Sequence, residues 1–372
     1  MPGLEYNPNP KAHQNANIKV LIVITTAFVP YGGLTTVMIN YLEQMDRTGL
    51  IIDVVSGNNI QTEMKKKIEG LGIRYFKIEG RRKSPLKYYL RIKRMAESYD
   101  VIHVNGNSST ASLELLAAKK AGVCKRIAHN HSSSCSHKYI HLLLLPLFRR
   151  LYTKAVACSD QAGKFAFGNK RYTILKNAIS VERYSYSEEK RRVIRRVYAV
   201  PETAFVVGHV GKMNHDKNQR FLVDVFGELT KKVDNVFLML VGDGKLRAEI
   251  EKQIDDLHLR KRVVLTGMQS DASSFYSAMD IFVFPSLHEG MGMVCVEAQA
   301  SGLSVIASEE VPNEADCTPL FFKMDLDEGR KAWANKLYDY MNNNRCICRS
   351  KTYEFGDYDI RLSTNLLRKL WE

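Results

Sequence analysis

The stretch that decides the fold is HEGMGMVCVEAQASGLSVIAS, residues 288–308, in which Glu289 and Glu297 stand eight positions apart. The apolar run at 282–284 precedes it and stops at Pro285. A short apolar run that ends at a proline turn is typical of a strand buried inside a sheet. The first glutamate therefore lies in a Gly-rich loop that follows a predicted strand.

A helix is predicted to follow that loop, because residues 294–300 have helical character and Gly302 can end a helix. Eight positions at helical rise span about 10 Å. This is comparable to the separation between the sugar ring and the ribose of a sugar nucleotide. Free N–H groups and the positive dipole at the start of a helix favour a diphosphate. The stretch thus predicts a diphosphate site with a carboxylate at each end.

A second motif, GHVGKMNHDKN at residues 208–218, opens the later half of the chain behind another apolar run. Gly211 lets the backbone approach a ligand closely. Lys212 and Lys217 can meet phosphate oxygens as point charges. This motif therefore predicts a second contribution to the same diphosphate site.

Apolar runs alternate with helical stretches along the chain, which predicts an α/β architecture with parallel sheets. The alternation weakens near residues 180–200 and then restarts, so two consecutive Rossmann-like domains are expected, with ligands at the carboxyl ends of the strands. We expect a flexible lead-in at 1–17, an N-terminal domain at 18–185, a C-terminal domain at 200–352 and a terminal helical segment at 353–372. The predicted strands are residues 18–25, 51–55, 74–78, 101–104, 126–129, 155–158, 204–210, 236–241, 263–265, 281–284 and 304–307.

These patterns together resemble the retaining glycosyltransferases of family 4. The resemblance rests on Pro-Ser-x-x-Glu-Gly followed by Glu-Ala-x-x-x-Gly within residues 285–302, and it extends over residues 18–370. It is most specific at 208–218 and 282–308. The resemblance implies the GT-B fold, in which two Rossmann-like domains face a cleft and the C-terminal helix returns to the N-terminal domain.

The activity implied by the resemblance is transfer of a sugar from a nucleotide-diphosphate donor, UDP-linked by family habit, to a saccharide or lipid-linked saccharide. Similar proteins often serve capsule or exopolysaccharide assembly. The anomeric configuration would be retained by front-face attack, with the leaving phosphate helping to take the acceptor proton. Two lysines and a helix N-terminus can stabilise a leaving diphosphate electrostatically, so no metal and no cofactor is expected.

By resemblance, Glu289 contacts the donor sugar, Glu297 accepts the ribose hydroxyls and Lys217 holds the diphosphate. Lys212 stands where the family usually has an arginine. The lysine keeps the positive charge but loses the bidentate hydrogen bonding of a guanidinium. Glu289, Lys217 and His129 are the expected catalytic residues. The residues expected to bind the donor are Gly32, Gly33, Gly211, Lys212, Lys217, Gly242, Met268, Glu289, Gly290, Met291, Gly292, Met293 and Glu297.

Histidines lie at the ends of two neighbouring predicted strands of the N-terminal domain. The family often has a histidine at one of these strand ends, pointing at the donor sugar. His129 fits that place as the last residue of its strand, and His131 is the competing choice. His103, Asn105 and His131 are expected to contact the acceptor.

The composition is that of a globular protein, with 45% hydrophobic residues and a formal net charge of +14. Seven scattered cysteines, an odd number, favour reduced thiols in the cytoplasm. Zinc-finger, RRM and KH signatures are absent from the sequence, so an anionic membrane is the favoured partner over nucleic acid. The basic and apolar stretches at 83–94 and 139–154 suit peripheral attachment to the inner face of a membrane, although the leucine run can equally be a core helix.

Three alternatives remain open. Asp325-Leu326-Asp327 follows an apolar run and resembles the metal motif of GT-A enzymes, although its place in the chain does not fit that fold. A GT-B-fold epimerase or phosphorylase is a second enzymatic candidate. The third is a non-catalytic basic scaffold that binds membrane or nucleic acid, for which Glu289 and Glu297 would be dispensable.

Overall fold

The computed structural model describes residues 17–29, 33–269, 271–343, 349 and 353–372. The predicted lead-in at 1–17, apart from residue 17, and the predicted donor residue Gly32 lie outside the described residues. The chain forms two compact units, Met1–Ala178 with Ile360–Glu372, and Ile179–Asp359. None of the helices in the described ranges has the length and apolarity needed to span a bilayer.

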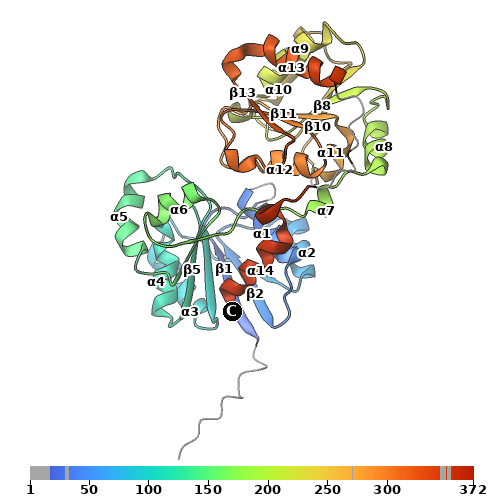
Figure 1. Ribbon diagram of the computed structural model, residues 1–372. Helices are drawn as coiled ribbons and strands as arrows, with labels where there is room; N and C mark the ends of the chain where they lie inside the picture. The colour runs from blue at the N-terminus through green and yellow to red at the C-terminus, as the bar shows by residue number, and fades with distance from the viewer. Residues whose placement is uncertain (1–16, 30–32, 270, 344–348, 350–352) are drawn as a thin grey trace, which may run out of the picture. The chain divides into compact units, whose positions relative to one another are not determined.

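The first unit is built on a seven-stranded parallel sheet with the order β3-β2-β1-β4-β5-β6-β7 (Figure 1). The central strand β1 (Ile18–Ile24) has its interior residues fully buried, as the continuous apolar run predicts for a strand covered on both faces. The strand order reverses between β1 and β4. The other strands are β2 (Leu50–Ser56), β3 (Arg74–Lys77), β4 (Val101–Gly106), β5 (Lys125–Asn130), β6 (Lys154–Ala157) and β7 (Thr173–Ile174).

The last helix, α14 (Ile360–Trp371), packs on the first unit, as predicted. Its buried residues Ile360, Leu367 and Trp371 share one core with β1 and with α1 (Gly33–Gln44). In Figure 1 the red α14 lies across the face of the blue strands. The remaining helices of this unit are α2 (Thr62–Gly70), α3 (Pro85–Ala96), α4 (Ser112–Lys120), α5 (Lys138–Phe148) and α6 (Asp160–Phe167), with the 3-10 turn η1 (Ser109–Ala111).

The second unit holds a six-stranded parallel sheet with the order β10-β9-β8-β11-β12-β13. Its strands are β8 (Phe205–Val210), β9 (Val236–Val241), β10 (Val263–Gly267), β11 (Ile281–Phe284), β12 (Val305–Ser308) and β13 (Phe321–Met324). Separate apolar clusters cover its two faces. Its helices are α7 (Val181–Tyr184), α8 (Glu188–Val197), α9 (Gln219–Thr230), α10 (Arg247–Asp256), α11 (Ser273–Ala278), α12 (Met293–Ala300) and α13 (Gly329–Asn343), with 3-10 turns η2 (His215–Lys217), η3 (Asn313–Ala315), η4 (Leu326–Glu328) and η5 (Gly356–Tyr358).

Both sheets have the doubly wound strand order 3-2-1-4-5-6, with one further strand in the first unit, which confirms the two Rossmann-like domains that the sequence predicts. All eleven predicted strands are present. The sequence missed β7 and β13, which have two and four residues. Both are edge strands with partly exposed side chains, so neither has the continuous apolar run of a central strand.

Candidate active site

The two sequence motifs of the C-terminal half meet at one edge of the second sheet. Residues 211–218 follow β8, and residues 285–292 follow β11. The strand order reverses between these two hydrogen-bonded strands. Ligands of open α/β sheets bind outside the carboxyl ends of the strands at such a reversal. We therefore take these two loops as the candidate site.

Lys217 and Glu289, which come from the two different loops, form an ion pair between the lysine Nζ and the glutamate Oε2. Their side chains are 21% and 15% exposed. The lysine Nζ also lies 5.1 Å from the ring centroid of Phe284, the last residue of β11. Glu289 is fixed further, because its Oε1 accepts from the backbone N–H of Gly290 at 3.0 Å. The structure thus joins two of the predicted catalytic residues.

A buried histidine holds the first loop. His209 Nδ1 donates to the Val283 carbonyl at 2.9 Å, which leaves Nε2 to accept from Gln219 Nε2 at 3.2 Å. Gln219 Nε2 also donates to the Lys212 carbonyl at 3.0 Å. Burial lowers the pKa of His209 to about 4, so the ring is neutral at physiological pH. Sequence analysis missed this support, because nothing local marks His209 as a partner of a residue ten positions away.

Two glycines allow a third loop to pack against the first. A Cβ on Gly242 would stand 2.1 Å from the Gly211 carbonyl oxygen, and one on Gly244 would stand 2.2 Å from the Met213 oxygen. Gly242 also has a φ of 134°, which other residues rarely adopt. Met213 N–H donates to the carbonyl of Asp243 at 2.9 Å. Gly242 is therefore required by close backbone packing, and its contact with a donor stays a prediction.

The loop after β11 leads into α12, as predicted. Gly292 is the N-cap with a φ of 66°, and among the described residues no side chain caps this end of the helix. A Cβ added to Gly290 would meet nothing within 4 Å, so the backbone there is open to a ligand. Met291 and Met293 are half-buried beside it. The helix start thus has an uncapped positive end at the candidate site.

Glu297, on the same helix, lies among aromatic and charged side chains. Its Oε2 accepts from the Tyr276 hydroxyl at 2.7 Å. Burial raises the pKa of Glu297 to about 7, although hydrogen bonds from Tyr276 and Tyr184 act in the opposite direction. Nearby, Arg183 pairs with Asp271 at 3.1 Å. The two tyrosines were not found by sequence analysis, since they lie 21 and 113 positions away from Glu297 with no motif around them.

Three other predicted donor residues, Lys212, Met268 and Gly33, are exposed. Lys212 is exposed, and within the described ranges its ammonium has no hydrogen bond or ion pair. Met268 is 48% exposed and follows the edge strand β10. Gly33 begins α1 in the first unit and is also exposed.

In the first unit the structure gathers His103, Asn105, His129 and His131. The β4–β5 register pairs Asn105 with His129, and alternation along each strand places His103 on the same face as both. His103 Nε2 lies 3.2 Å from His129 Nδ1, and His131 Nε2 lies 2.9 Å from Asn105 Oδ1. His129 is the penultimate residue of β5, which ends at Asn130.

Burial lowers the pKa values of all three histidines. The pKa falls to about 3 for His103 and for His131, and well below the ordinary value for His129. A hydrogen bond from the Asn177 side chain acts against this shift at His131, whereas His129 Nε2 is buried without a hydrogen-bond partner among the described residues. Buried polar atoms are rarely left unpaired in this way.

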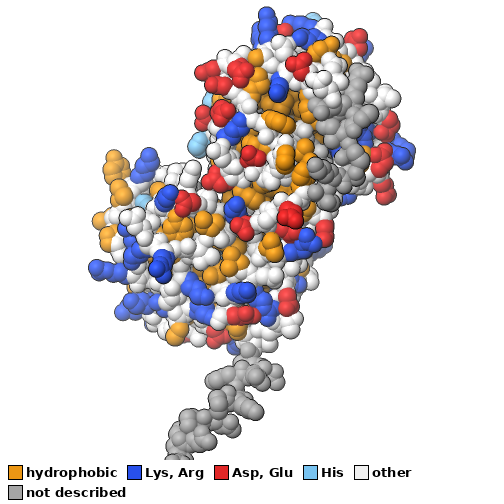
Figure 2. Space-filling model, in the orientation of Figure 1, with side chains coloured by type: hydrophobic (Ala, Val, Ile, Leu, Met, Phe, Trp, Pro, Cys, Tyr) orange, Lys and Arg blue, Asp and Glu red, His pale blue; other side chains and the backbone are white. Residues whose placement is uncertain are grey.

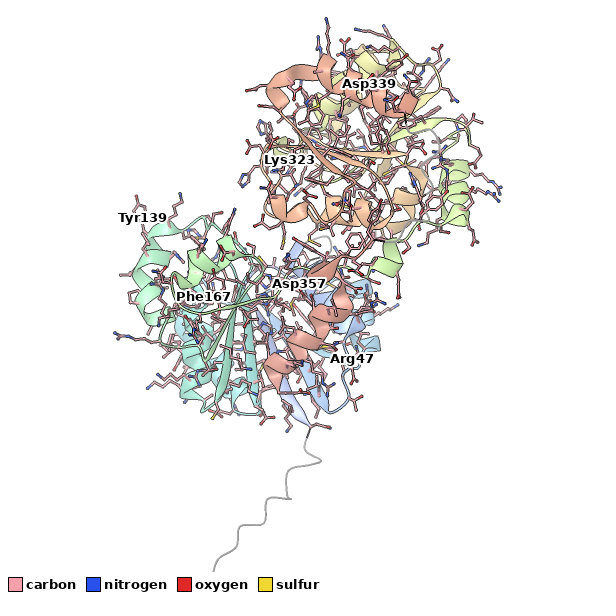
Figure 3. All side chains as sticks on the ribbon, in the orientation of Figure 1. Arg47, Tyr139, Phe167, Lys323, Asp339 and Asp357 are labelled. Carbon is pink, nitrogen blue, oxygen red and sulfur yellow. The ribbon has the colours of Figure 1, made fainter. Side chains whose placement is uncertain are left out.

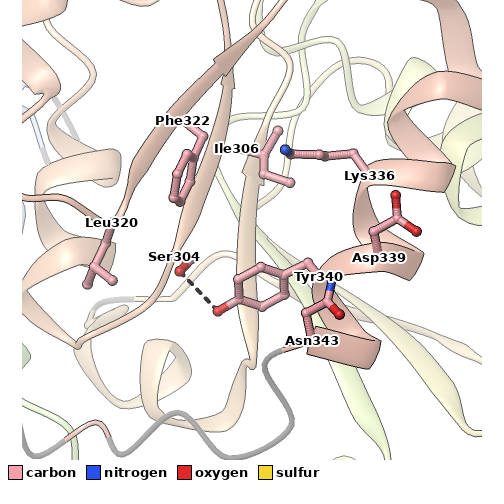
Figure 4. A pocket seen from close by; sticks show the side chains of 8 residues that line it. All are labelled: Ser304, Ile306, Leu320, Phe322, Lys336, Asp339, Tyr340 and Asn343. Atoms are coloured by element: carbon pink, nitrogen blue, oxygen red, sulfur yellow. Dashed lines mark hydrogen bonds between the residues drawn. The ribbon is translucent and has the colours of Figure 1, made fainter.

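A cavity of about 500 Å³ lies elsewhere in the second unit (Figure 4). Ser304 and Leu320, which immediately precede β12 and β13, line it together with Tyr340 from α13. The Tyr340 hydroxyl donates to Ser304 Oγ at 3.0 Å. The cavity is therefore at the amino ends of these strands, away from the loops that carry Lys217 and Glu289.

The aspartates of the GT-A alternative have a structural role. Asp325 caps η4, accepting from the N–H of Asp327 at 2.9 Å, and Glu328 completes a capping box. Across the described residues, His, Cys, Asp and Glu side chains form no group of three or more that could hold a metal ion.

Two family models match the chain. "Glycosyltransferase Family 4" matches residues 31–183, and "Glycosyl transferases group 1" matches residues 190–318, so together they cover more than two thirds of the chain. The first match includes His129, and the second includes Lys217, Glu289 and Glu297.

Relatives with known names agree with these matches. The chain is 29% identical over 322 residues to the putative glycosyltransferase EpsF of Bacillus subtilis, covering 82% of this chain and 84% of EpsF. It is 29% identical over 245 residues, 61% of either chain, to the UDP-Gal:α-D-GlcNAc-diphosphoundecaprenol α-1,3-galactosyltransferase of Escherichia coli. Other relatives are named for capsular polysaccharide biosynthesis in Staphylococcus aureus.

Solved structures share the fold. HepE of Anabaena in complex with UDP superposes with a TM-score of 0.70 at 18% identity, covering 95% of this chain and 96% of HepE. At that identity the likeness shows the fold alone. Taken with the family models, the strand orders and the paired motifs at β8 and β11, these findings show that the chain belongs to the family 4 glycosyltransferases of GT-B fold.

Proposed function

We propose that this glycosyltransferase transfers a sugar from a UDP-sugar to a saccharide or lipid-linked saccharide in cell-surface polysaccharide synthesis, with retention of anomeric configuration. The observation that carries the proposal is the Lys217–Glu289 ion pair, placed beside the uncapped start of α12, with Glu297 further along that helix. A cation, a helix N-terminus and two carboxylates match the parts of a nucleotide sugar: a diphosphate flanked by two hydroxyl-bearing rings.

The pair also suggests how the leaving group is stabilised. Negative charge develops on the diphosphate as the glycosidic bond breaks, and a cation placed there in advance lowers the barrier. Lys217 is held by Glu289 and by the ring of Phe284. A diphosphate that arrives at the loop would share the ammonium with Glu289, and Glu289 would then be available to sugar hydroxyls. We propose that this stabilisation needs no metal ion or cofactor.

The relatives support the choice of substrates. HepE has been solved with UDP and with UDP-glucose. The E. coli relative is named for a UDP-Gal donor and a GlcNAc-diphosphoundecaprenol acceptor. We therefore infer a UDP-sugar donor and favour an acceptor attached to a lipid.

An exposed apolar surface on the first unit fits a lipid-linked acceptor. On α5, Tyr139 is 90% exposed, Leu142 63% and Leu143 79%, and Figure 3 shows Tyr139 at the outer start of this helix. Basic side chains, including exposed Lys138 and Arg150, stand next to it in sequence. Figure 2 shows hydrophobic and basic side chains mingled over this unit. We propose that this α5 surface binds an anionic membrane from the cytoplasmic side.

The donor site is tested by measuring UDP release from a panel of UDP-sugars, with and without EDTA. We expect slow release from one donor that EDTA does not reduce and that Lys217→Met lowers about 100- to 1000-fold. The matched control is Lys261→Met, an exposed lysine on the same unit, which should release UDP at the wild-type rate. Release that requires added Mg²⁺ or Mn²⁺ would contradict the metal-independent part of the proposal.

The membrane surface is tested separately by sedimentation with vesicles that contain anionic phospholipid. Leu142→Glu with Leu143→Glu should lose binding, whereas Leu362→Glu, an exposed leucine of α14 that is 57% exposed, should keep it. Binding to vesicles without turnover of any UDP-sugar would instead favour the non-catalytic scaffold.

A further inference from the structure

The C-terminal helix reaches the histidine group of the first unit through one side chain. Trp371 is fully buried, and its indole Nε1–H donates to His103 Nδ1 at 3.2 Å. His103 Nε2 in turn lies 3.2 Å from His129 Nδ1, with the two ring planes within 15° of parallel. Three aromatic side chains from α14, β4 and β5 thus form a continuous hydrogen-bonded chain.

This chain fixes the position of every ring proton. An indole N–H can only donate, so His103 Nδ1 is the acceptor and carries no proton. A neutral imidazole has one proton, which on His103 must then be on Nε2, where it is donated to His129 Nδ1. The proton of His129 is therefore on Nε2. Burial keeps these rings neutral at physiological pH.

The atom at the end of the chain has no partner. His129 Nε2 is buried and makes no hydrogen bond within the described part of the protein. His131, whose ring centroid is 3.9 Å from that of His129, is held by two amide side chains: its Nε2 lies 2.9 Å from Asn105 Oδ1, and Asn177 also hydrogen-bonds to the ring. The unpaired N–H of His129 is therefore the group left to donate to a ligand oxygen.

We propose that Trp371 and His103 are positioning residues that hold His129 in its Nε2–H tautomer, so that His129 donates a hydrogen bond to a substrate oxygen. In this state His129 Nε2 cannot accept a proton, and His129 acts as a donor instead of a general base. His103 then works through His129, in place of the direct acceptor contact that the sequence suggests. This inference rests on the proposed function only for the identity of the oxygen.

Ring-nitrogen NMR of the full chain labelled with ¹⁵N-histidine tests the tautomer directly, because protonated and bare ring nitrogens resonate at different shifts. The His129 signals are identified by their loss in His129→Gln. We expect His129 in the Nε2–H form alone in the wild type. In Trp371→Phe, which keeps a ring and removes the N–H, the Nδ1–H form of His129 should appear as a substantial fraction.

The chain contains a matched control in its other tryptophan. Trp333 is buried in the second unit and donates to the Asp325 carbonyl at 2.8 Å, so Trp333→Phe should leave the His129 signals unchanged. An Nδ1–H His129 in the wild type, or an unchanged His129 in Trp371→Phe, would overturn the proposal.

A second pair of variants keeps the test decisive if Trp371→Phe does not fold. His103→Gln places an amide donor near the Nε2 position and should retain the Nε2–H form of His129, whereas His103→Leu should lose it. More of the Nε2–H form of His129 in His103→Leu than in His103→Gln would contradict the proposal that His103 sets this tautomer. Turnover should fall with His103→Leu and recover in part with His103→Gln. The NMR result stands without any turnover, so a failure of the proposed function and a failure of this inference are distinguishable.

Discussion

At the scale of single residues, the candidate site depends on charges that are only partly in contact with water. Lys217 and Glu289 neutralise each other beside Phe284, and Glu297 accepts a hydrogen bond from the neutral Tyr276 hydroxyl. Removing one member of such a group leaves the other unpaired, which costs more than the pair itself contributes. Substitutions here must therefore be compared with variants that keep the charge.

Lys217→Met should lower the turnover number about 100- to 1000-fold, the usual effect of losing one preorganised group that stabilises developing negative charge. Lys217→Arg keeps the charge and should recover part of this loss. Steady-state kinetics of UDP release would measure both. Equal losses in the two variants would mean that the geometry of the loop matters and the cation does not.

Glu297→Gln should change how stability depends on pH. The pKa of Glu297 is raised from 4.5 to about 7 in the folded protein. Between these values the folded state binds more protons than the unfolded state, so the free energy of unfolding falls as pH rises. The contribution is up to about 3 kcal/mol. Urea unfolding at pH 5 and pH 8 should show a smaller difference in Glu297→Gln than in the wild type.

Glu310→Gln, at an exposed glutamate of the same unit, is the control and should retain the wild-type difference. The donor KM should also rise below pH 7 in the wild type, because a protonated Glu297 is a poorer acceptor for ribose hydroxyls. That rise should be absent in Glu297→Gln. A wild-type KM that is constant from pH 5 to 8 would contradict the ribose role.

At the scale of elements, the site is three loops packed on one another at the ends of β8, β9 and β11. The loop after β8 is fixed by His209 and Gln219, and by contact with Gly242 and Gly244 after β9. Because backbone packs directly against backbone here, a side-chain movement cannot relieve the steric clash that an added Cβ would cause.

Gly244→Ala should therefore destabilise the second unit by about 1–3 kcal/mol, the cost typical of overpacking. Its new Cβ would stand 2.2 Å from the Met213 carbonyl oxygen. Gly227→Ala is the opposite case: it lies inside α9, its Cβ would stand 3.6 Å from Leu257, and it should gain up to about 1 kcal/mol of helix propensity. Urea unfolding followed by Trp333 fluorescence would measure both, and a neutral Gly244→Ala would show that the loop can move.

The elements show what could be read from the sequence. The predicted strands at 236–241 and 281–284 coincide with β9 and β11, because continuous apolar runs bounded by turn residues admit few other interpretations. The α5 leucine run was ambiguous between a core helix and a surface helix, and the structure exposes most of it. Only neighbouring elements decide that question, and they are distant in sequence.

The site itself was predicted in its parts and not in its contacts. Lys217 and Glu289 were each assigned to the donor by motif, yet their ion pair joins positions 72 residues apart. Tyr276 beside Glu297 and Trp371 beside His103 have no local pattern at all. Motifs report which residue types a loop carries, whereas partners from other strands and helices depend on the tertiary fold.

At the scale of the whole molecule, each unit has its own core and its own tryptophan. Trp371 belongs to the first unit and Trp333 to the second, and the chain has two tryptophans. Each tryptophan therefore reports on one unit if the other is replaced by phenylalanine.

UDP should raise the melting temperature reported by Trp333, because a ligand stabilises the unit that binds it in proportion to RT ln(1 + [L]/Kd). At about 100 times its Kd, the gain is about 2.7 kcal/mol. The fluorescence of Trp333 in Trp371→Phe would report the melting temperature of the second unit. The fluorescence of Trp371 in Trp333→Phe would report the melting temperature of the first unit. If UDP raised only the melting temperature reported by Trp371, the nucleotide would bind to the first unit, which would contradict the prediction.

The first unit is discontinuous: it consists of Met1–Ala178 and Ile360–Glu372, with the whole second unit inserted between them. During synthesis the ribosome therefore completes the second unit before it makes α14. Until then the apolar face that receives Ile360, Leu367 and Trp371 lacks these side chains, and His103 lacks its hydrogen bond from Trp371. The first unit to be started is thus the last whose core can be completed.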